Sequence, residues 1–166
     1  MFINQVTSFF SRIHIVIINH LNPIEIMPII DSIMLFTSLD EHEKDLIASR
    51  CHFLDLPADT KVIEQGEIAD TFHAIVYGRV IISIKSQSQG WVRAGMMSAG
   101  NVFGEIAIIK NIPRIARVTT YTSCRFLTIN SHDFLEIYHY FSAKARDNIQ
   151  LIIAKRLEQS KYYTNL

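Results

Sequence analysis

The stretch 103–118, FGEIAIIKNIPRIARV, holds residues whose types and spacing could do chemistry. It contains one glycine, a run that can form a short helix, and a single carboxylate, Glu105, nine residues before Arg114. Free amides at the start of a short helix attract an anion. Arg114 can donate charge-assisted hydrogen bonds to phosphate oxygens, whereas an ionised Glu105 can only accept, which suits a sugar hydroxyl. The pairing therefore favours a sugar phosphate over a bare anion.

Taken alone, Glu105 and Arg114 also fit an ordinary surface ion pair, which needs no ligand. Enzyme chemistry finds less support. The seven histidines are scattered without an HxH pair, and the sequence has no GxSxG, P-loop or HExxH motif. Cys51 and Cys124 form no CxxC pair and are expected to be reduced thiols of a cytoplasmic protein. We therefore expect no catalysis, no metal and no cofactor.

The charge balance argues against a dedicated nucleic-acid surface, because Lys plus Arg equals Asp plus Glu at 16 each in 166 residues. Nearly half of the residues are apolar, enough for a buried core. Only a short tail follows Leu157, so a helix-turn-helix DNA-binding domain after the last helix is not expected.

Residues 1–32 form an unusually apolar N-terminal segment. It lacks the basic start of a secretory signal, and polar residues interrupt it too often for a membrane span. An apolar seam at intervals of three and four predicts an amphipathic helix that packs on its own domain, forms a dimer or partner interface, or binds a membrane surface. The seam residues are Ile3, Val6, Phe10, Ile13 and Ile17.

The chain predicts helices before a run of strands. Asn22-Pro23 should end the first helix, and a short helix should run to about Met34 with Pro28 in its first turn. Ser38 and Glu41 have the spacing of a capping box for a helix over 39–49.

Seven or so short β-rich runs lie between residues 52 and 130, separated by turn-forming residues. Their close spacing predicts an antiparallel roll or barrel. Helical patterns follow: one helix capped by Ser131 or Asp133 and ending at His139, and a longer one from Ser142 to about Gln159. The apolar face of the longer helix holds Ile149, Ile152, Ile153 and Leu157.

The 103–118 stretch resembles the phosphate-binding cassette of the cyclic-nucleotide-binding domain family, roughly FGELAL followed after a few residues by PRAAxV. The upstream run KVIEQGEIADTFHAIVYGRVII is similar to the family's strand–turn–strand signature, with Gly66, Asp70, Phe72, Ile75 and Gly78 in register. The likeness covers about residues 33–157 and implies an α+β, mainly β architecture: an antiparallel β-roll (jelly-roll barrel) with flanking N- and C-terminal helices. It places the binding domain at 33–160 and a tail at 161–166.

By that resemblance, Glu105 would hold the ribose hydroxyl and Arg114 the cyclic phosphate, with backbone amides of Ala107 and Ile115 adding contacts. Tyr162 and Tyr163 are candidates for stacking on the base, and an exposed tail is the alternative. The ligand-binding set that the resemblance implies is Gly104, Glu105, Ile106, Ala107, Arg114, Ile115, Ala116 and Arg117.

Four positions depart from the family pattern. Ile115 stands where the family usually has Ala, and its branched side chain could crowd the phosphate. Arg117 replaces a small residue and could face a guanine edge or point into solvent. Asp59 and Ala69 occupy common glycine positions, although Asp tolerates left-handed backbone geometry.

The resemblance thus predicts a stand-alone regulatory sensor of cyclic AMP or cyclic GMP, with no DNA-binding domain and no transmembrane span. It would act through its N- or C-terminal helices on a protein partner or on a second copy of itself, with the nucleotide drawing the last helix over the site as a lid. The alternative is a domain of the same fold that binds no nucleotide and serves as a protein-interaction scaffold.

Overall fold

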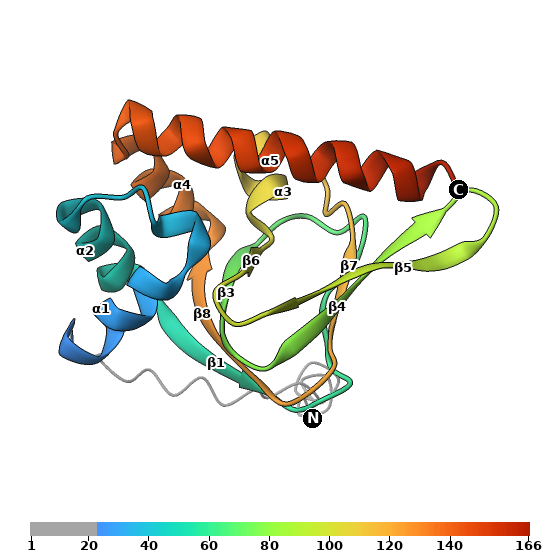
Figure 1. Cartoon of the computed structure of the whole chain (residues 1–166), viewed down its shortest axis with the longest axis horizontal. Helices are drawn as coiled ribbons and strands as arrows, with labels where there is room; N and C mark the ends of the chain where they lie inside the picture. The colour runs from blue at the N-terminus through green and yellow to red at the C-terminus, as the bar shows by residue number, and fades with distance from the viewer. Residues whose placement is uncertain (1–22) are drawn as a thin grey trace, which may run out of the picture.

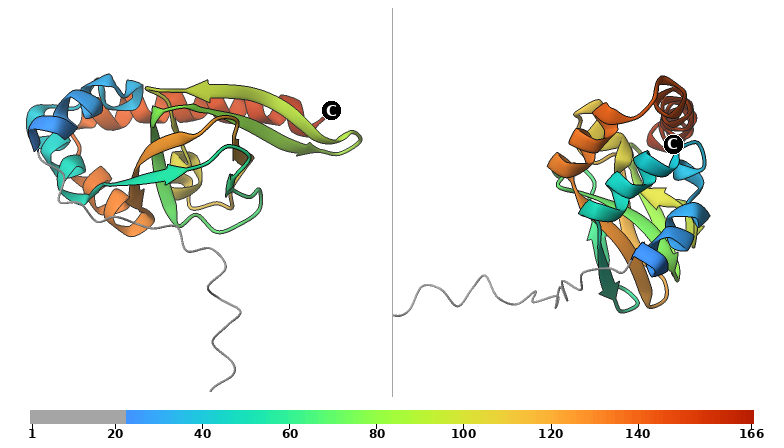
Figure 2. Two further views of the ribbon diagram at one scale, coloured as in Figure 1. Left: turned by 90° about the horizontal axis from the view of Figure 1, so that it is seen from below. Right: turned by 90° about the vertical axis from the view of Figure 1, so that its left-hand side faces the viewer.

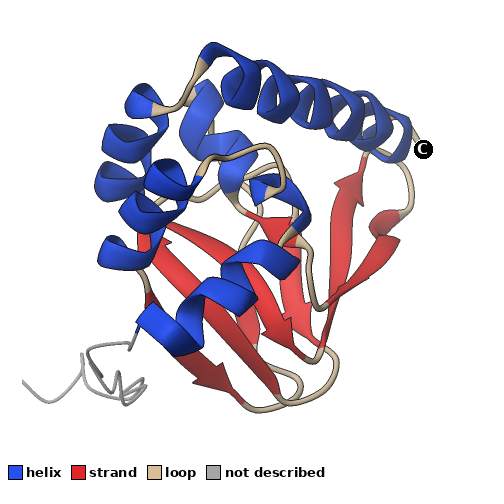
Figure 3. Cartoon of the chain, turned by 60° about the vertical axis from the view of Figure 1, so that its left-hand side comes forward, coloured by secondary structure: helices blue, strands red, loops and turns tan. Residues whose placement is uncertain are grey.

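The computed structural model describes residues 23–166, in which eight strands form two four-stranded antiparallel sheets (Figure 1, Figure 3). One sheet has the order β1-β8-β3-β6 and the other β2-β7-β4-β5. The strand bounds are β1 His52–Leu56, β2 Lys61–Ile63, β3 Thr71–Tyr77, β4 Arg79–Ser86, β5 Gly90–Ser98, β6 Val102–Phe103, β7 Arg117–Thr120 and β8 Cys124–Asn130. The predicted β-roll with flanking helices is confirmed.

The helices gather at one end of the roll, except for the short α3 and the long α5 (Figure 2). Their bounds are α1 Pro23–Ser32, the 3-10 helix η1 Met34–Phe36, α2 Glu41–Arg50, α3 Glu105–Lys110, α4 Ser131–Tyr140 and α5 Ala143–Thr164. Helix α5 runs lengthwise beside the β4–β5 hairpin, so that its C-terminal end meets the hairpin tip (Figure 1). There the amide of Gln87 donates to the carbonyl of Thr164 at 3.2 Å.

The larger hydrophobic core lies between the helices and the β1-β8-β3-β6 sheet. Phe72 of β3 stacks on Phe134 of α4 with ring centroids 4.4 Å apart. The buried Ile149 and Ile153 anchor α5 in the same core, while Ile152 and Leu157 of its predicted apolar face are half-buried there. A smaller core around Phe126 fills the space inside the roll. The site is therefore supported by apolar packing from both sheets and from α5.

The start of α2 differs from the expected capping box at Ser38 and Glu41. Asp40 is the N-cap, accepting from the amide of Glu43 at 2.8 Å, and the Glu43 carboxylate accepts from the Asp40 amide at 2.9 Å. The helix begins two residues later than predicted because Leu39 is buried in the core before it, and Ser38 makes no cap. The same S/D-x-x-E pattern occurs twice in this stretch, and core packing selects the second copy.

Three other helical details differ from the sequence prediction. Pro28 lies inside α1 and not in its first turn. A proline there cannot donate the helical hydrogen bond, and burial of Ile26 and Ile30 in the core offsets that loss. Asn130 caps α4 through the amide of Asp133, ahead of the expected Ser131. Ser142 caps α5 as predicted, but the helix continues past Gln159 to Thr164.

Helix α1 lies in residues expected to belong to the N-terminal segment, yet its buried side chains join the main core. The seam predicted from Ile3 to Ile17 falls outside the described residues. Within residues 23–166, no helix combines the length and the apolar character needed to cross a lipid bilayer.

Candidate functional site

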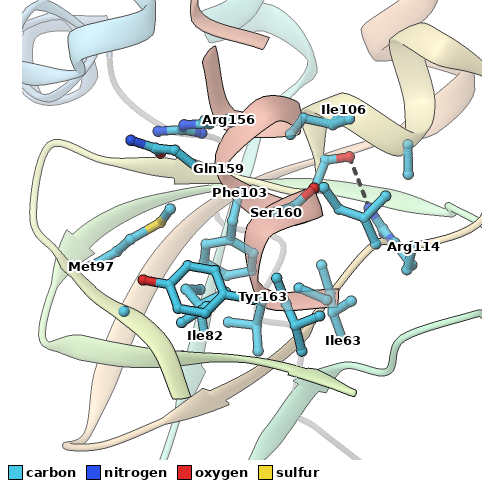
Figure 4. Close-up of a pocket in the computed structure, with 18 of the residues that line it drawn as sticks. Ile63, Ile82, Met97, Phe103, Ile106, Arg114, Arg156, Gln159, Ser160 and Tyr163 are labelled. Atoms are coloured by element: carbon cyan, nitrogen blue, oxygen red, sulfur yellow. Dashed lines mark hydrogen bonds between the residues drawn. The ribbon is translucent and has the colours of Figure 1, made fainter. Parts of the chain in front are cut away.

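A pocket of about 280 Å³ lies between the β2-β7-β4-β5 sheet, the segment around α3, and α5 (Figure 4). Apolar side chains such as Ile82, Met97 and Phe103 form most of its wall. Its charged lining residues are Glu105, Arg114 and Arg156. A mostly apolar cleft with a few placed polar groups is typical of small-molecule sites. The pocket draws residues from elements that are far apart in the sequence, including Ile63, Ala116, Val118 and Ser160.

Gly104 makes the close approach at the centre of the site possible. It precedes α3 with φ of +91°, a backbone conformation that side chains rarely adopt. A Cβ there would lie 2.7 Å from Nη1 of Arg114 and 3.0 Å from the carbonyl oxygen of Thr71. Glycine therefore lets the start of α3 and the Arg114 guanidinium sit side by side.

Arg114 is 4% exposed and is held by oxygens of two neighbouring segments. Its Nη1 donates to the carbonyl of Gly104 at 2.9 Å, and its Nη2 donates to the carbonyl of Thr71 at 2.6 Å and to Oδ1 of Asp70 at 3.1 Å. Burial lowers the pKa of Arg114 from its ordinary value, while the Asp70 carboxylate acts in the opposite direction. These contacts fix the orientation of the guanidinium at the pocket wall.

Glu105, the first residue of α3, is 1% exposed and faces the same pocket. Burial raises its pKa above the ordinary value, and the charge of Arg156 on α5 opposes that rise. Nη1 of Arg156 donates to Oε1 of Glu105 at 2.6 Å and to the carbonyl of Val102 at 2.9 Å. The acid at the site therefore already has a cationic partner, supplied by the C-terminal helix.

Arg156 is a pocket residue that belongs to none of the sequence motifs. The sequence does carry a signal for it: Arg156 lies three residues after Ile153 and seven after Ile149, which places it on the buried face of α5. A lone basic residue in an otherwise apolar stripe needs a buried acid or carbonyl as its partner. In the structure, Glu105 is the buried acid that pairs with Arg156.

Seven of the eight predicted ligand-binding residues line the pocket together, namely Gly104, Glu105, Ile106, Ala107, Arg114, Ile115 and Ala116. Arg117 lies outside the lining. Side chains alternate along β7, so that Arg117 falls on the opposite face from the buried Val118. There it makes a two-pronged ion pair with Glu64 at 2.9 and 3.0 Å and covers the Trp91 ring at 3.6 Å from the centroid.

The two tyrosines near the C-terminus separate in the structure. Tyr163 lines the pocket beside Gln159, as the close-up shows (Figure 4). Tyr162 is 65% exposed and is not part of the lining. Ile115 lines the pocket and also packs against the main core. Asp59 adopts a φ of +58° at the position where the family commonly has glycine.

The sequence profile of the cyclic nucleotide-binding domain family matches residues 53–140, more than half of the chain. The chain belongs to that family.

Among curated proteins, the chain is 24% identical over 108 residues to a cAMP-dependent protein kinase regulatory subunit from Mucor circinelloides f. lusitanicus. The match covers 65% of this chain and 25% of that relative, so the chain spans about a quarter of the relative's length.

Solved structures share the fold at low sequence identity. The regulatory domain of Toxoplasma gondii PKA, crystallised with cAMP, superposes with a TM-score of 0.68 at 20% identity, covering 80% of this chain and 48% of that one. The regulatory subunit of a cAMP-independent protein kinase A from Trypanosoma cruzi, bound to guanosine, gives a TM-score of 0.71 at 17% identity, with 82% and 46% covered.

Proposed function

We propose that this chain is a regulatory module that binds a cyclic nucleotide in the pocket under α5 and catalyses no reaction. The observation that supports this most directly is the convergence of Glu105, Arg114 and Gly104 on one apolar pocket. A buried acid and a buried guanidinium on one wall match a ligand that carries both hydroxyl groups and an anion.

The cyclic phosphate and the ribose hydroxyl of the ligand each have a proposed partner. Arg114 retains N–H groups beyond those bonded to Gly104, Thr71 and Asp70, and these would donate to the cyclic phosphate. Amides of the first turn of α3, including Ala107, lack acceptors within the helix and would add to that contact. Oε2 of Glu105 would accept from the ribose hydroxyl, while Oε1 faces Arg156.

The base would lie toward Tyr163, which offers an aromatic face from the last turns of α5. We propose cyclic AMP as the ligand in preference to cyclic GMP. The supporting observation is that Arg117, the residue that could have read a guanine edge, is committed to Glu64 and Trp91 outside the pocket. The named function of the Mucor relative points the same way.

The output would pass through α5. The ribose and Arg156 would both bind the Glu105 carboxylate. Ribose binding would therefore change the hydrogen bond between Arg156 and Glu105 that holds α5 over the pocket. A ligand shifts such an equilibrium only through its different affinity for the two arrangements. The exposed surface of α5, where Leu151 is 70% exposed, would then present a ligand-dependent face to a protein partner or to a second copy of the chain.

The test is calorimetric titration of cyclic AMP and cyclic GMP into the wild type, Glu105→Gln and Arg114→Lys. Glu105→Gln makes the acceptor neutral, and Arg114→Lys keeps the charge but removes the paired donors of the guanidinium. A hydrogen bond to a charged group is worth about 1.5–3 kcal/mol, so each variant should lose about ten- to a hundredfold in affinity. Arg125→Lys is a matched control, because Arg125 pairs with Asp55 on the surface away from the pocket. Wild-type affinity in both site variants would place the binding site elsewhere.

Guanosine serves as a second probe in the same titration. A nucleoside carries no phosphate, so its binding should not depend on the guanidinium of Arg114. The chain would instead be a nucleoside sensor if it binds guanosine tightly, keeps that binding in Arg114→Lys, and binds neither cyclic nucleotide. No saturable heat with any of the three ligands would favour the scaffold alternative.

A further inference from the structure

His73 is a buried polar residue in the middle of β3, 3% exposed. Its neighbours across the sheet are Thr128 on β8 and Phe103 on β6. The imidazole stacks on the Phe103 ring with centroids 5.1 Å apart, and Phe103 lines the nucleotide pocket. His73 therefore sits directly behind the pocket wall without facing the cavity.

Both ring nitrogens of His73 have hydroxyl partners. Nδ1 lies 2.9 Å from Oγ1 of Thr128, and Nε2 lies 3.0 Å from Oγ1 of Thr71. The Thr71 hydroxyl in turn donates to Oδ1 of Asp70 at 3.0 Å. The same Asp70 oxygen accepts from Nη2 of Arg114 at 3.1 Å. A continuous chain of hydrogen bonds thus runs from the core to the guanidinium.

The direction of this chain follows from counting protons. The Asp70 carboxylate is acceptor-only when ionised, so the single hydroxyl proton of Thr71 points at it. Toward His73, the Thr71 oxygen can then only accept, which places the ring proton on Nε2. In a neutral ring Nδ1 must accept, and the Thr128 hydroxyl donates to it.

The charge states of the groups agree with that direction. Burial, together with the nearby charge of Arg114, lowers the pKa of His73 to about 3, so the ring is neutral near pH 7. Partial burial would raise the pKa of Asp70, but the hydrogen bond from Thr71, its own backbone amide and the charge of Arg114 hold it below the ordinary value.

We propose that His73 is a positioning residue for Arg114, acting through the side chain of Thr71. The Nε2–H donor holds Thr71 in the rotamer that serves Asp70, and the Thr71 carbonyl accepts from Nη2 of Arg114 at 2.6 Å. Because the Asp70 side chain is 81% exposed, its hydrogen bonds with Thr71 and Arg114 fix the orientation of the carboxylate. The consequence for ligand affinity rests on the proposed function.

Two variants break the chain at different links. His73→Phe keeps an aromatic ring against Phe103 and removes both hydrogen bonds, whereas Thr71→Val keeps the branched shape and removes the hydroxyl. Each should weaken cyclic AMP binding about three- to tenfold, the value of a neutral hydrogen bond.

Matched controls separate positioning from general loss of stability. Thr71→Ser retains the hydroxyl and should bind cyclic AMP as the wild type does. Phe126→Leu removes a buried ring that touches the His73 imidazole edge-on, 5.8 Å between centroids, but breaks no hydrogen bond of the chain. It should lower the melting temperature without lowering the affinity. Equal affinities of wild type, His73→Phe and Thr71→Val would overturn the proposal.

A second measurement needs no ligand. Nitrogen-15 NMR of the free wild-type protein should show His73 protonated at Nε2 and not at Nδ1. The guanidinium protons of Arg114 should exchange with water faster in Thr71→Val than in Thr71→Ser. A proton on Nδ1, or unchanged Arg114 exchange, would overturn the positioning role even if nucleotide binding holds. Absence of nucleotide binding in the wild type would refute the proposed function while these spectra still decide the role of His73.

Discussion

Arg156 of α5 donates a 2.6 Å hydrogen bond to Oε1 of Glu105, joining the C-terminal helix to the carboxylate at the base of α3. The carboxylate is 1% exposed and the Arg156 side chain 22% exposed. The two residues are 51 positions apart in the sequence, so the pair connects elements that are distant along the chain. Its position makes α5 part of the pocket wall.

The first prediction concerns this pair. Arg156→Ala leaves a buried carboxylate without its cation, and removing one partner of a buried hydrogen-bonded pair is destabilising. We expect the free energy of unfolding to fall by about 1.5–3 kcal/mol, the range for hydrogen bonds to charged groups. Urea denaturation monitored by circular dichroism measures it. Arg125→Ala, which breaks the exposed pair with Asp55, should cost less than about 1 kcal/mol, and equal losses in the two variants would contradict the account.

The second prediction tests Gly104 against a glycine of the same backbone conformation. Gly104 and Gly66 have φ of +91° and +90°, but a Cβ at Gly66 meets nothing within 4 Å, whereas one at Gly104 meets Arg114. Both alanine variants should therefore carry similar backbone strain, of order 1 kcal/mol. Only Gly104→Ala should also abolish cyclic AMP binding, as calorimetry would show; retained binding would mean that the close approach is not needed.

Much of the fold and site could be predicted from the sequence. The β-rich runs and the turn residues between them predict the roll. The resemblance of residues 103–118 to the phosphate-binding cassette predicts that Glu105 and Arg114 share one site, and both line the pocket. Local patterns cannot distinguish equivalent capping boxes, which is why tertiary burial of Leu39 was needed to select Asp40. Strand β6 has only two residues, too few to show the alternating pattern of a strand in the sequence. It is defined by its pairing with β3.

The remaining differences at the site have a similar cause. Arg117 belongs to the cassette by sequence, yet the alternation of β7 turns it toward Glu64 and Trp91. The partnership of Arg156 with Glu105 depends on how α5 crosses the roll, and this long-range arrangement leaves no short motif. The hydrogen bonds of His73 leave no motif either, because its partner Thr128 lies 55 residues away in the sequence.

The third prediction separates the two tyrosines of α5. Tyr163 lines the pocket and Tyr162 is 65% exposed, although the residues are adjacent and their rings contact each other. Loss of a base-stacking ring costs about 1–3 kcal/mol, so Tyr163→Ala should weaken cyclic AMP binding by about five- to a hundredfold. Tyr162→Ala should leave the dissociation constant unchanged in a fluorescence competition assay. The reverse order would place the base on the other side of the helix.

The fourth prediction concerns stability against pH. His73 has a pKa of about 3 in the fold, against 6.5 ordinarily. Between these values the unfolded chain binds a proton that the folded chain excludes, so this contribution to stability is full above pH 6.5 and is lost as the pH falls. The slope approaches about 1.4 kcal/mol per pH unit for one proton.

Other groups act in the same pH range, so the prediction is a difference between variants. Burial also lowers the pKa of His52, which adds to the slope, and burial raises the pKa of Glu105, which opposes it. The contributions of His52 and Glu105 remain in the His73→Phe variant. Urea denaturation between about pH 7 and pH 5 should show a steeper loss of stability in the wild type than in His73→Phe. Parallel curves would mean that His73 is not buried in its neutral form.

The central claim is that Glu105 and Arg114 together hold a cyclic nucleotide, and the most direct test is a calorimetric titration of the wild-type chain with cyclic AMP. The account predicts saturable binding with one nucleotide per chain, weaker binding of cyclic GMP, and loss of both in the double variant Glu105→Gln, Arg114→Lys. Absence of saturable heat with either nucleotide, in a protein whose folding is verified by circular dichroism, would contradict it.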